Sequence, residues 1–75
     1  MASLHQVVAR ALNVKDVSDE TSPETQRKWD SLRHLDLMNT IEDEFGVRFS
    51  TAEIMQARSV GDIRRLLREK GKNVE

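Results

Sequence analysis

The segment WDSLRHLDLMNTIEDEFG, residues 29–46, decides how this chain folds. Asp30 is a favoured residue type for a helix N-cap, and Gly46 suits a left-handed cap at a helix C-terminus. Between them, apolar side chains recur at helical spacing, at Leu32, Leu35, Leu37, Met38, Ile41 and Phe45. The pattern predicts an amphipathic helix from Ser31 to Phe45.

This predicted helix has two faces when successive residues are placed about 100° apart. The apolar face, which we expect in the core, carries Leu35, Leu37, Met38, Ile41 and Phe45. The opposite face carries Leu32, Arg33, Asp36, Asn39, Thr40 and Asp43. His34 falls on the core side, and we interpret it as a partly buried histidine hydrogen-bonded to the preceding loop.

Leu32 is an apolar residue on an otherwise polar face, directly after Ser31. It is either a stray surface leucine, which is common, or a docking residue beside a functional hydroxyl. A third interpretation is that the first turn of the helix buries Leu32 against the loop. The sequence leaves these interpretations open.

The chain before this helix contains a second helix and a long loop. Ser3 is a plausible N-cap, and apolar spacing predicts a helix from Leu4 to Leu12. Residues 13–30 show no sustained period and contain many turn formers, although a short helical turn over residues 23–27 is compatible with Pro23. Unstructured connections of this length are often functional. Its strong apolar anchors are Val14, Val17 and Trp29.

The chain after this helix predicts two further helices. Val47 and Phe49 alternate with polar residues, and we expect an extended crossing that fills the core, because a lone strand has no partner. Ser50 and Glu53 form a capping box, which predicts a short helix over residues 52–57. A similar pattern at residues 59–62 predicts a last helix that ends at Gly71, with its apolar side inward at Val60, Ile63, Leu66 and Leu67. The predicted fold is an all-α bundle of three principal helices and one short helix, in a single domain over residues 1–75.

Composition excludes several classes of function. The chain has 12 basic and 13 acidic residues, whereas a nucleic-acid or general phosphate binder usually has a clear basic excess. It has no cysteine, and its 2 histidines are too few for a histidine-rich metal site, so no metal centre is expected. No signal-peptide pattern and no apolar run of membrane-spanning length are visible, which predicts a cytoplasmic protein that does not insert into membranes.

Ser31 is the candidate functional residue. In the first turn of a helix, its hydroxyl lies near unpaired backbone N–H groups and the positive end of the helix dipole, which favour a negatively charged substituent. Asp30 as the cap fixes the helix start, although its own negative charge works partly against such a group. We therefore interpret Ser31 as a covalent attachment point, while noting that Asp-Ser-Leu alone also begins many ordinary helices.

Three other functions fit the same residues less well. A Ser31–His34 hydrolase lacks both a Gly-x-Ser-x-Gly elbow and an acid behind the histidine, so no catalytic residue is predicted. A helix-turn-helix nucleic-acid binder, with the basic last helix as the reader, conflicts with the near-zero net charge. A helical interaction module without a prosthetic group explains Leu32, but it does not explain a serine placed at a helix start after a long loop.

The sequence resembles the acyl carrier protein family over nearly its whole length. The resemblance lies in Trp29-Asp30-Ser31-Leu32, in Glu42, Glu44, Phe45 and Gly46, and in the final stretch from Ser59 through Ile63 to Leu66. It implies that Ser31 carries 4′-phosphopantetheine, transferred from coenzyme A by a separate phosphopantetheinyl transferase. The thiol of this arm would hold an acyl or aminoacyl group as a thioester for delivery to partner enzymes.

The resemblance also implies where partner enzymes bind. Mapped onto this sequence, the partner face consists of Leu32, Arg33, Asp36, Asn39, Thr40 and Asp43, the same face that helical geometry gives. Carriers of primary fatty-acid synthesis are strongly acidic, whereas this chain is nearly neutral and has Arg33 where an acidic residue is frequent. The expectation is a monomeric carrier dedicated to a specialised pathway, with a peptidyl or aminoacyl carrier as the alternative.

Overall fold

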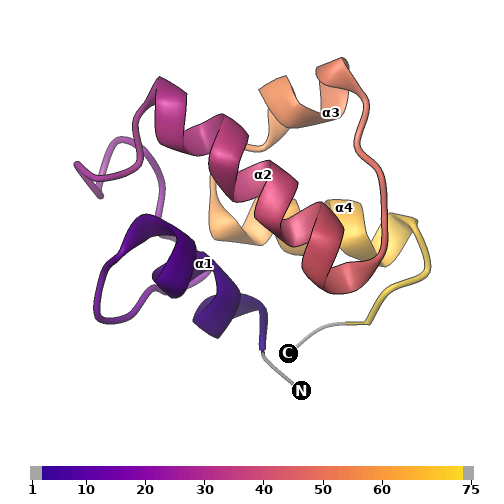
Figure 1. Cartoon of the computed structure of the whole chain (residues 1–75), viewed down its shortest axis with the longest axis horizontal. Coiled ribbons are helices and arrows are strands. Elements are labelled where there is room, and N and C mark those ends of the chain that lie inside the picture. The colour runs from indigo at the N-terminus through magenta and orange to yellow at the C-terminus, as the bar shows by residue number, and fades with distance from the viewer. Residues whose placement is uncertain (1–2, 74–75) are drawn as a thin grey trace.

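The computed structural model of the chain describes residues 3–73, which fold into four helices joined by loops (Figure 1). They are α1 (Leu4–Leu12), α2 (Ser31–Phe45), α3 (Thr51–Gln56) and α4 (Val60–Glu69). The all-α bundle with one short helix is therefore confirmed. The predicted domain covers residues 1–75, of which residues 1–2 and 74–75 lie outside this description.

Local capping residues set the helix boundaries. Asp30 accepts a hydrogen bond from the Arg33 N–H at 2.9 Å, so α2 begins at Ser31 as predicted. Gly46 follows α2 in the left-handed conformation with φ of 67°, which glycine adopts at no steric cost. Ser50 and Glu53 form the predicted capping box, although α3 begins and ends one residue earlier than expected. The last helix ends at Glu69, with Lys70 as its cap, before Gly71.

The core is formed by side chains from α1, α2 and α4 together with loop residues. α2 crosses the molecule next to α1 (Figure 1), and its buried side chains are Leu37, Met38 and Ile41. One predicted core residue is corrected, because Leu35 is 54% exposed. Phe45 is partly buried and packs against the core from the edge of the buried face.

The long loop between α1 and α2 is fixed to α4 by backbone hydrogen bonds. The N–H groups of Val60 and Gly61 donate to the carbonyls of Thr21 and Asp19, at 3.0 and 2.9 Å. A Cβ atom at position 61 would lie 3.2 Å from the Asp19 carbonyl oxygen, so this close approach favours glycine. The segment after Pro23 forms one hydrogen-bonded turn of helical type, in which the Gln26 N–H donates to the Ser22 carbonyl at 2.8 Å, and it does not extend into a helix.

Charged side chains reinforce the same attachment of the loop. Asp19 Oδ2 accepts from Nε of Arg64 at 3.2 Å, and Asp19 Oδ1 accepts from Nη2 of Arg64 at 3.1 Å. His5 Nε2 lies 2.7 Å from the same Oδ1. These partners come from α1 and α4, so one loop carboxylate joins the first and last helices. The hydrogen bond with His5, followed by that from Arg64, holds the pKa of Asp19 below its usual value.

The segment between α2 and α3 is an extended crossing, as predicted, and residues 3–73 contain no strand. Phe49 is buried, and its N–H donates to the Glu42 carboxylate at 2.7 Å. Lys70 lies over the Phe49 ring, 5.5 Å from its centroid, and pairs with Glu53 at 3.0 Å. No helix in the described range is long and apolar enough to cross a membrane.

Candidate functional site

Ser31 is the first residue of α2, and its side chain is exposed. It follows Trp29 and Asp30 at the point where the long loop turns into the helix (Figure 1). Across residues 3–73, no side-chain hydrogen bond engages the Ser31 hydroxyl. The hydroxyl is therefore accessible to another protein and free to react.

The backbone at the start of α2 leaves two donors beside this hydroxyl. Asp30 uses its carboxylate to cap the Arg33 N–H and its carbonyl to accept from the His34 N–H at 2.8 Å. The N–H groups of Ser31 and Leu32 have no partner within the helix, as is usual in a first turn. They offer hydrogen bonds to an anionic group on the serine and lie at the positive end of the helix dipole.

Trp29 and His34 pack together on the inner side of this junction. The indole Nε1–H of Trp29 donates to Nδ1 of His34 at 2.9 Å, and the rings stack with centroids 5.9 Å apart. The other ring nitrogen, Nε2, lies 2.7 Å from the Ile54 carbonyl oxygen in α3. The prediction of a partly buried histidine bonded to the loop is confirmed, and the bond to α3 is an addition that the sequence did not indicate.

This geometry also excludes His34 as a base for Ser31. Because Nδ1 accepts from Trp29, the neutral ring carries its proton on Nε2 and donates it to Ile54. Both nitrogens are thus engaged away from the serine hydroxyl. A Ser31–His34 catalytic pair is not assembled.

Five of the six residues on the predicted partner face are exposed. Leu32 is 80% exposed, so its burial against the loop is excluded. Arg33 is exposed, although its Nη1 reaches the Leu12 carbonyl at 3.4 Å, and Thr40 is half-buried and donates to the Asp36 carbonyl at 2.8 Å. The other exposed members of the face are Asp36, Asn39 and Asp43.

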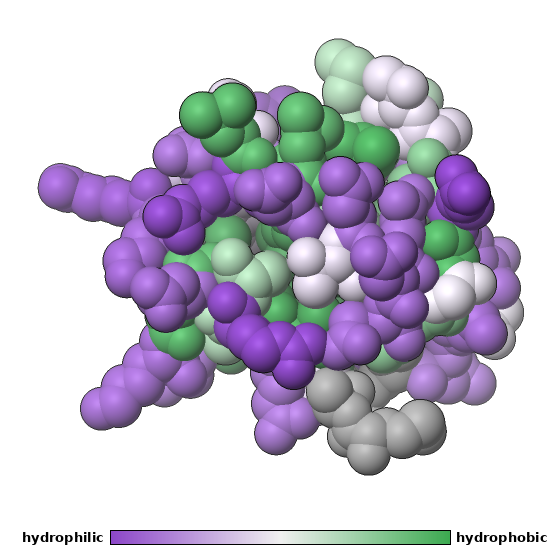
Figure 2. All heavy atoms as spheres, viewed as in Figure 1, coloured by the Kyte–Doolittle hydropathy of each residue, from purple (hydrophilic) through white to green (hydrophobic). Residues whose placement is uncertain are grey.

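Two exposed apolar residues, one on α2 and one on α3, were missed by sequence reasoning. Leu35 is 54% exposed and Met55 in α3 is 72% exposed. Figure 2 shows apolar side chains gathered along the edge formed by the start of α2 and by α3. The exposure of Leu35 could have been found from its helical angle, because a residue at i+3 lies only about 60° around the helix from Leu32. For Met55 no signal was available, because a helix of six residues has no useful period.

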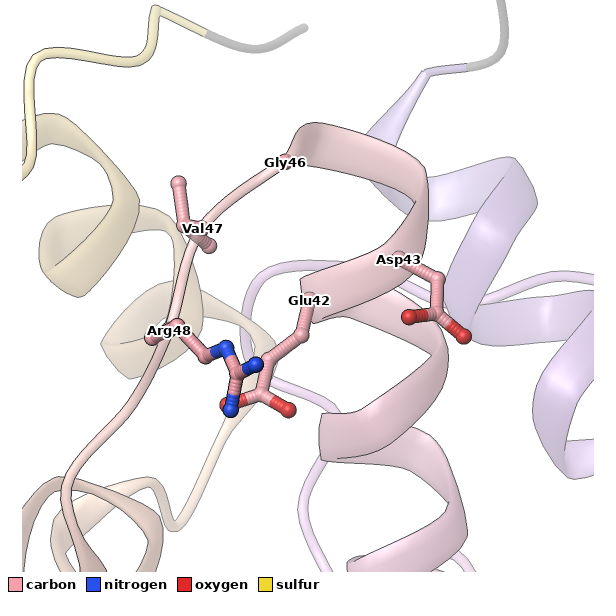
Figure 3. A pocket seen from close by; sticks show the side chains of 5 residues that line it. All are labelled: Glu42, Asp43, Gly46, Val47 and Arg48. Atoms are coloured by element: carbon pink, nitrogen blue, oxygen red, sulfur yellow. The ribbon is translucent and has the colours of Figure 1, made fainter.

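A surface pocket lies at the opposite end of α2, about 20 Å along the helix axis from Ser31. It is lined by Glu42, Asp43, Gly46, Val47 and Arg48 (Figure 3). The Asp43 side chain points away from Arg48 in this view, and Glu42 is already used as the acceptor for Phe49. This pocket does not include Ser31, and residues 3–73 hold no acidic or histidine cluster suited to a metal ion.

The structure is thus a small helical bundle that exposes the Ser31 hydroxyl at the start of α2. The sequence profile described as the phosphopantetheine attachment site matches residues 2–67. The chain therefore belongs to the family of phosphopantetheine-binding carrier proteins, which carry cargo and have no catalytic activity of their own. It contains an attachment site for phosphopantetheine.

Comparison with solved structures finds the same fold. The solution NMR structure of holo acyl carrier protein from Geobacter metallireducens is similar, with a TM-score of 0.73 at 22% identity. The match covers 100% of this chain and 98% of that chain. At this identity, the likeness supports the fold alone. Among curated proteins, none matches this chain.

Proposed function

We propose that Ser31 is the residue that carries 4′-phosphopantetheine. The observation that carries the proposal is its exposed, unengaged hydroxyl at the first position of α2, beside the free N–H groups of Ser31 and Leu32. These donors fit the phosphodiester that joins such an arm to a serine. When attached, the arm supplies a thiol that holds cargo as a thioester, and this chain has no cysteine of its own for that role. Asp30 fixes the position of the hydroxyl by capping the helix.

The proposed cargo is an acyl intermediate of a biosynthetic pathway, with a peptidyl or aminoacyl group as the alternative. The similar solved structure is described as an acyl carrier protein, and we extend that cargo class to this chain as part of the proposal. The formal net charge of −1 and Arg33 beside the site favour a specialised pathway over general fatty-acid synthesis. Partners would depend less on charge attraction, and their binding would be less sensitive to salt.

The proposed partner face surrounds Ser31 on α2. It would receive the phosphopantetheinyl transferase and the enzymes that load and unload the cargo, with Leu32 as the central apolar contact. The exposure of Leu32, Arg33, Asp36, Asn39 and Asp43 supports this role. Thr40 contributes at the margin, because its hydroxyl is bonded within the helix. We propose that the chain acts as a monomeric single domain in the cytoplasm, where coenzyme A is available to the transferase.

Intact-mass analysis tests the attachment residue. The wild type, incubated with coenzyme A and a broad-specificity transferase, should gain the mass of the arm, and Ser31→Ala should not. Ser18→Ala is the matched control, because Ser18 is also an exposed serine but lies in the loop, and it should be modified at the wild-type rate. A modified Ser31→Ala variant, or a wild type that stays unmodified with several transferases, would overturn the proposal.

A further inference from the structure

We propose that His34 is a positioning residue that couples the attachment serine to α3. The inference rests on the proposed function of Ser31 and adds a role for a side chain that does not itself touch the arm. One imidazole ring joins the loop before the serine, the helix that begins with it, and the following short helix. Ser31 and α3 are thereby held in one fixed arrangement for the transferase and later partners.

The first half of the coupling fixes the direction in which the chain enters α2. Trp29 precedes the Asp30 cap, and His34 is the fourth residue of the helix. These are the two positions that form a hydrophobic staple at many helix starts. Here the staple is a stacked pair with an indole hydrogen bond of 2.9 Å, and Trp29 is only 1% exposed. The orientation of Ser31, two residues after Trp29, therefore depends on this pair.

The second half of the coupling holds α3. This helix has six residues, and none of them is fully buried. Its other attachments are the partly buried Ile54 side chain, which packs against the core, and the ion pair of Glu53 with Lys70 at 3.0 Å. Its last carbonyls lack helical partners, and the Ile54 carbonyl accepts from the Ala57 N–H only at 3.4 Å. The His34 Nε2–H, at 2.7 Å, is the closer donor to that oxygen. His34 therefore serves as a tether for the C-terminal end of α3.

The two bonds require one acceptor and one donor on the same side chain. The Trp29 indole can only donate, and the Ile54 carbonyl can only accept. A neutral histidine with its proton on Nε2 meets both needs. A glutamine side chain also offers one acceptor and one type of donor, whereas leucine fills similar space with neither. This difference separates hydrogen-bonded positioning from simple packing.

The experiment compares His34→Leu, His34→Gln and the matched control His5→Leu. His5 is also a half-buried histidine bonded to the long loop, but its partner is Asp19 in the cluster with Arg64. We expect His34→Leu to lower kcat/KM for modification of Ser31 by about tenfold, because small misplacements of a reacting group are costly. His34→Gln should recover most of this loss, and His5→Leu should stay within about twofold of the wild type.

A spectroscopic readout keeps the test independent of the transferase. The chain has 1 tryptophan, so its indole N–H gives a single assignable NMR signal. His34→Leu should shift this signal and speed amide exchange in α3, whereas His5→Leu should change neither. If His34→Leu fails to fold, two other variants test the proposal. Trp29→Phe removes the indole donor and should change the ring nitrogen NMR signals of His34. His34→Gln should keep most of the wild-type transfer rate.

The outcomes separate the two proposals. Transfer to a folded His34→Leu chain at the wild-type rate, or His34→Gln as impaired as His34→Leu, would overturn the role of His34. A wild type that accepts no arm would overturn the proposed function instead. In that case, an unchanged indole signal and unchanged α3 exchange in His34→Leu would still count against the coupling, and altered ones would support it.

Discussion

The two histidines of this chain join loop to helix in opposite ways. His5 belongs to a charged cluster with Asp19 and Arg64, which fastens the middle of the long loop to α1 and α4. His34 belongs to a neutral arrangement with an indole and a carbonyl, beside the candidate attachment serine. The comparison indicates a division of roles. Ion pairs hold the long loop against α1 and α4, while neutral, directional hydrogen bonds set the geometry beside Ser31.

The largest effect on stability should come from the hydrophobic core, against which both the His5 cluster and the His34 arrangement are built. Ile41 is fully buried in the centre of α2, so Ile41→Ala should lower the free energy of unfolding by about 2–5 kcal/mol. Phe45→Ala should cost less, about 1–2 kcal/mol, because Phe45 is partly exposed. Urea denaturation followed by circular dichroism measures both values. Equal losses would mean that Phe45 is as much a core residue as Ile41.

A smaller effect, dependent on pH, should come from the charged cluster. The pKa of Asp19 is lowered in the folded chain by its bonds with His5 and Arg64. Its stabilising contribution is therefore present above the unfolded-state pKa and is lost as pH falls through the folded-state pKa. Asp19→Asn should lower Tm at neutral pH, and the difference from the wild type should shrink below about pH 4.

The control for this prediction is a variant that removes no ionisable group. Ile41→Ala truncates an apolar core side chain, so its difference from the wild type should not shrink in the same acid range. A Tm difference for Asp19→Asn that stays constant between neutral and acid pH would contradict the assigned role of the Asp19 carboxylate.

The smallest effect on stability is expected at the exposed face. Leu32 is 80% exposed, so Leu32→Ala should change the free energy of unfolding by no more than about 0.5 kcal/mol. The same variant should slow transfer of the arm to Ser31 several-fold, because a partner loses its apolar contact. Circular dichroism and the transfer assay measure the two effects. Loss of helicity would show that Leu32 supports the fold, and unchanged transfer would remove it from the partner face.

The sequence predicted the features that local chemistry determines. Asp30, Gly46 and Ser50 act on their own neighbours, so the start and end of α2 and the capping box of α3 could be read from adjacent residues. Ser31 was found for the same reason, because a hydroxyl after a cap residue lies in the first turn of a helix. The assignment of Leu35 to the core was wrong. The buried face of α2 is formed by Leu37, Met38 and Ile41, and Leu35 lies at the edge of that face, where it is 54% exposed.

The contacts between distant segments could not be predicted. The bond from Trp29 to His34 spans five positions, but the bond from His34 to Ile54 spans 20, and the contact between Arg64 and His5 spans 59. Nothing in the residues around position 54 indicates which carbonyl will face the imidazole. Such contacts depend on how the helices pack, which a single sequence does not specify.

The burial of Trp29 gives this chain an optical reporter of its own. Its indole is the only tryptophan fluorophore, it is 1% exposed, and it lies two residues before the candidate attachment serine. Emission from a buried indole shifts to longer wavelength when water reaches the ring. Arm transfer, cargo loading and partner binding that disturb the start of α2 should therefore be measurable by fluorescence in the unlabelled protein, while events confined to the Asp19 cluster should leave the emission unchanged.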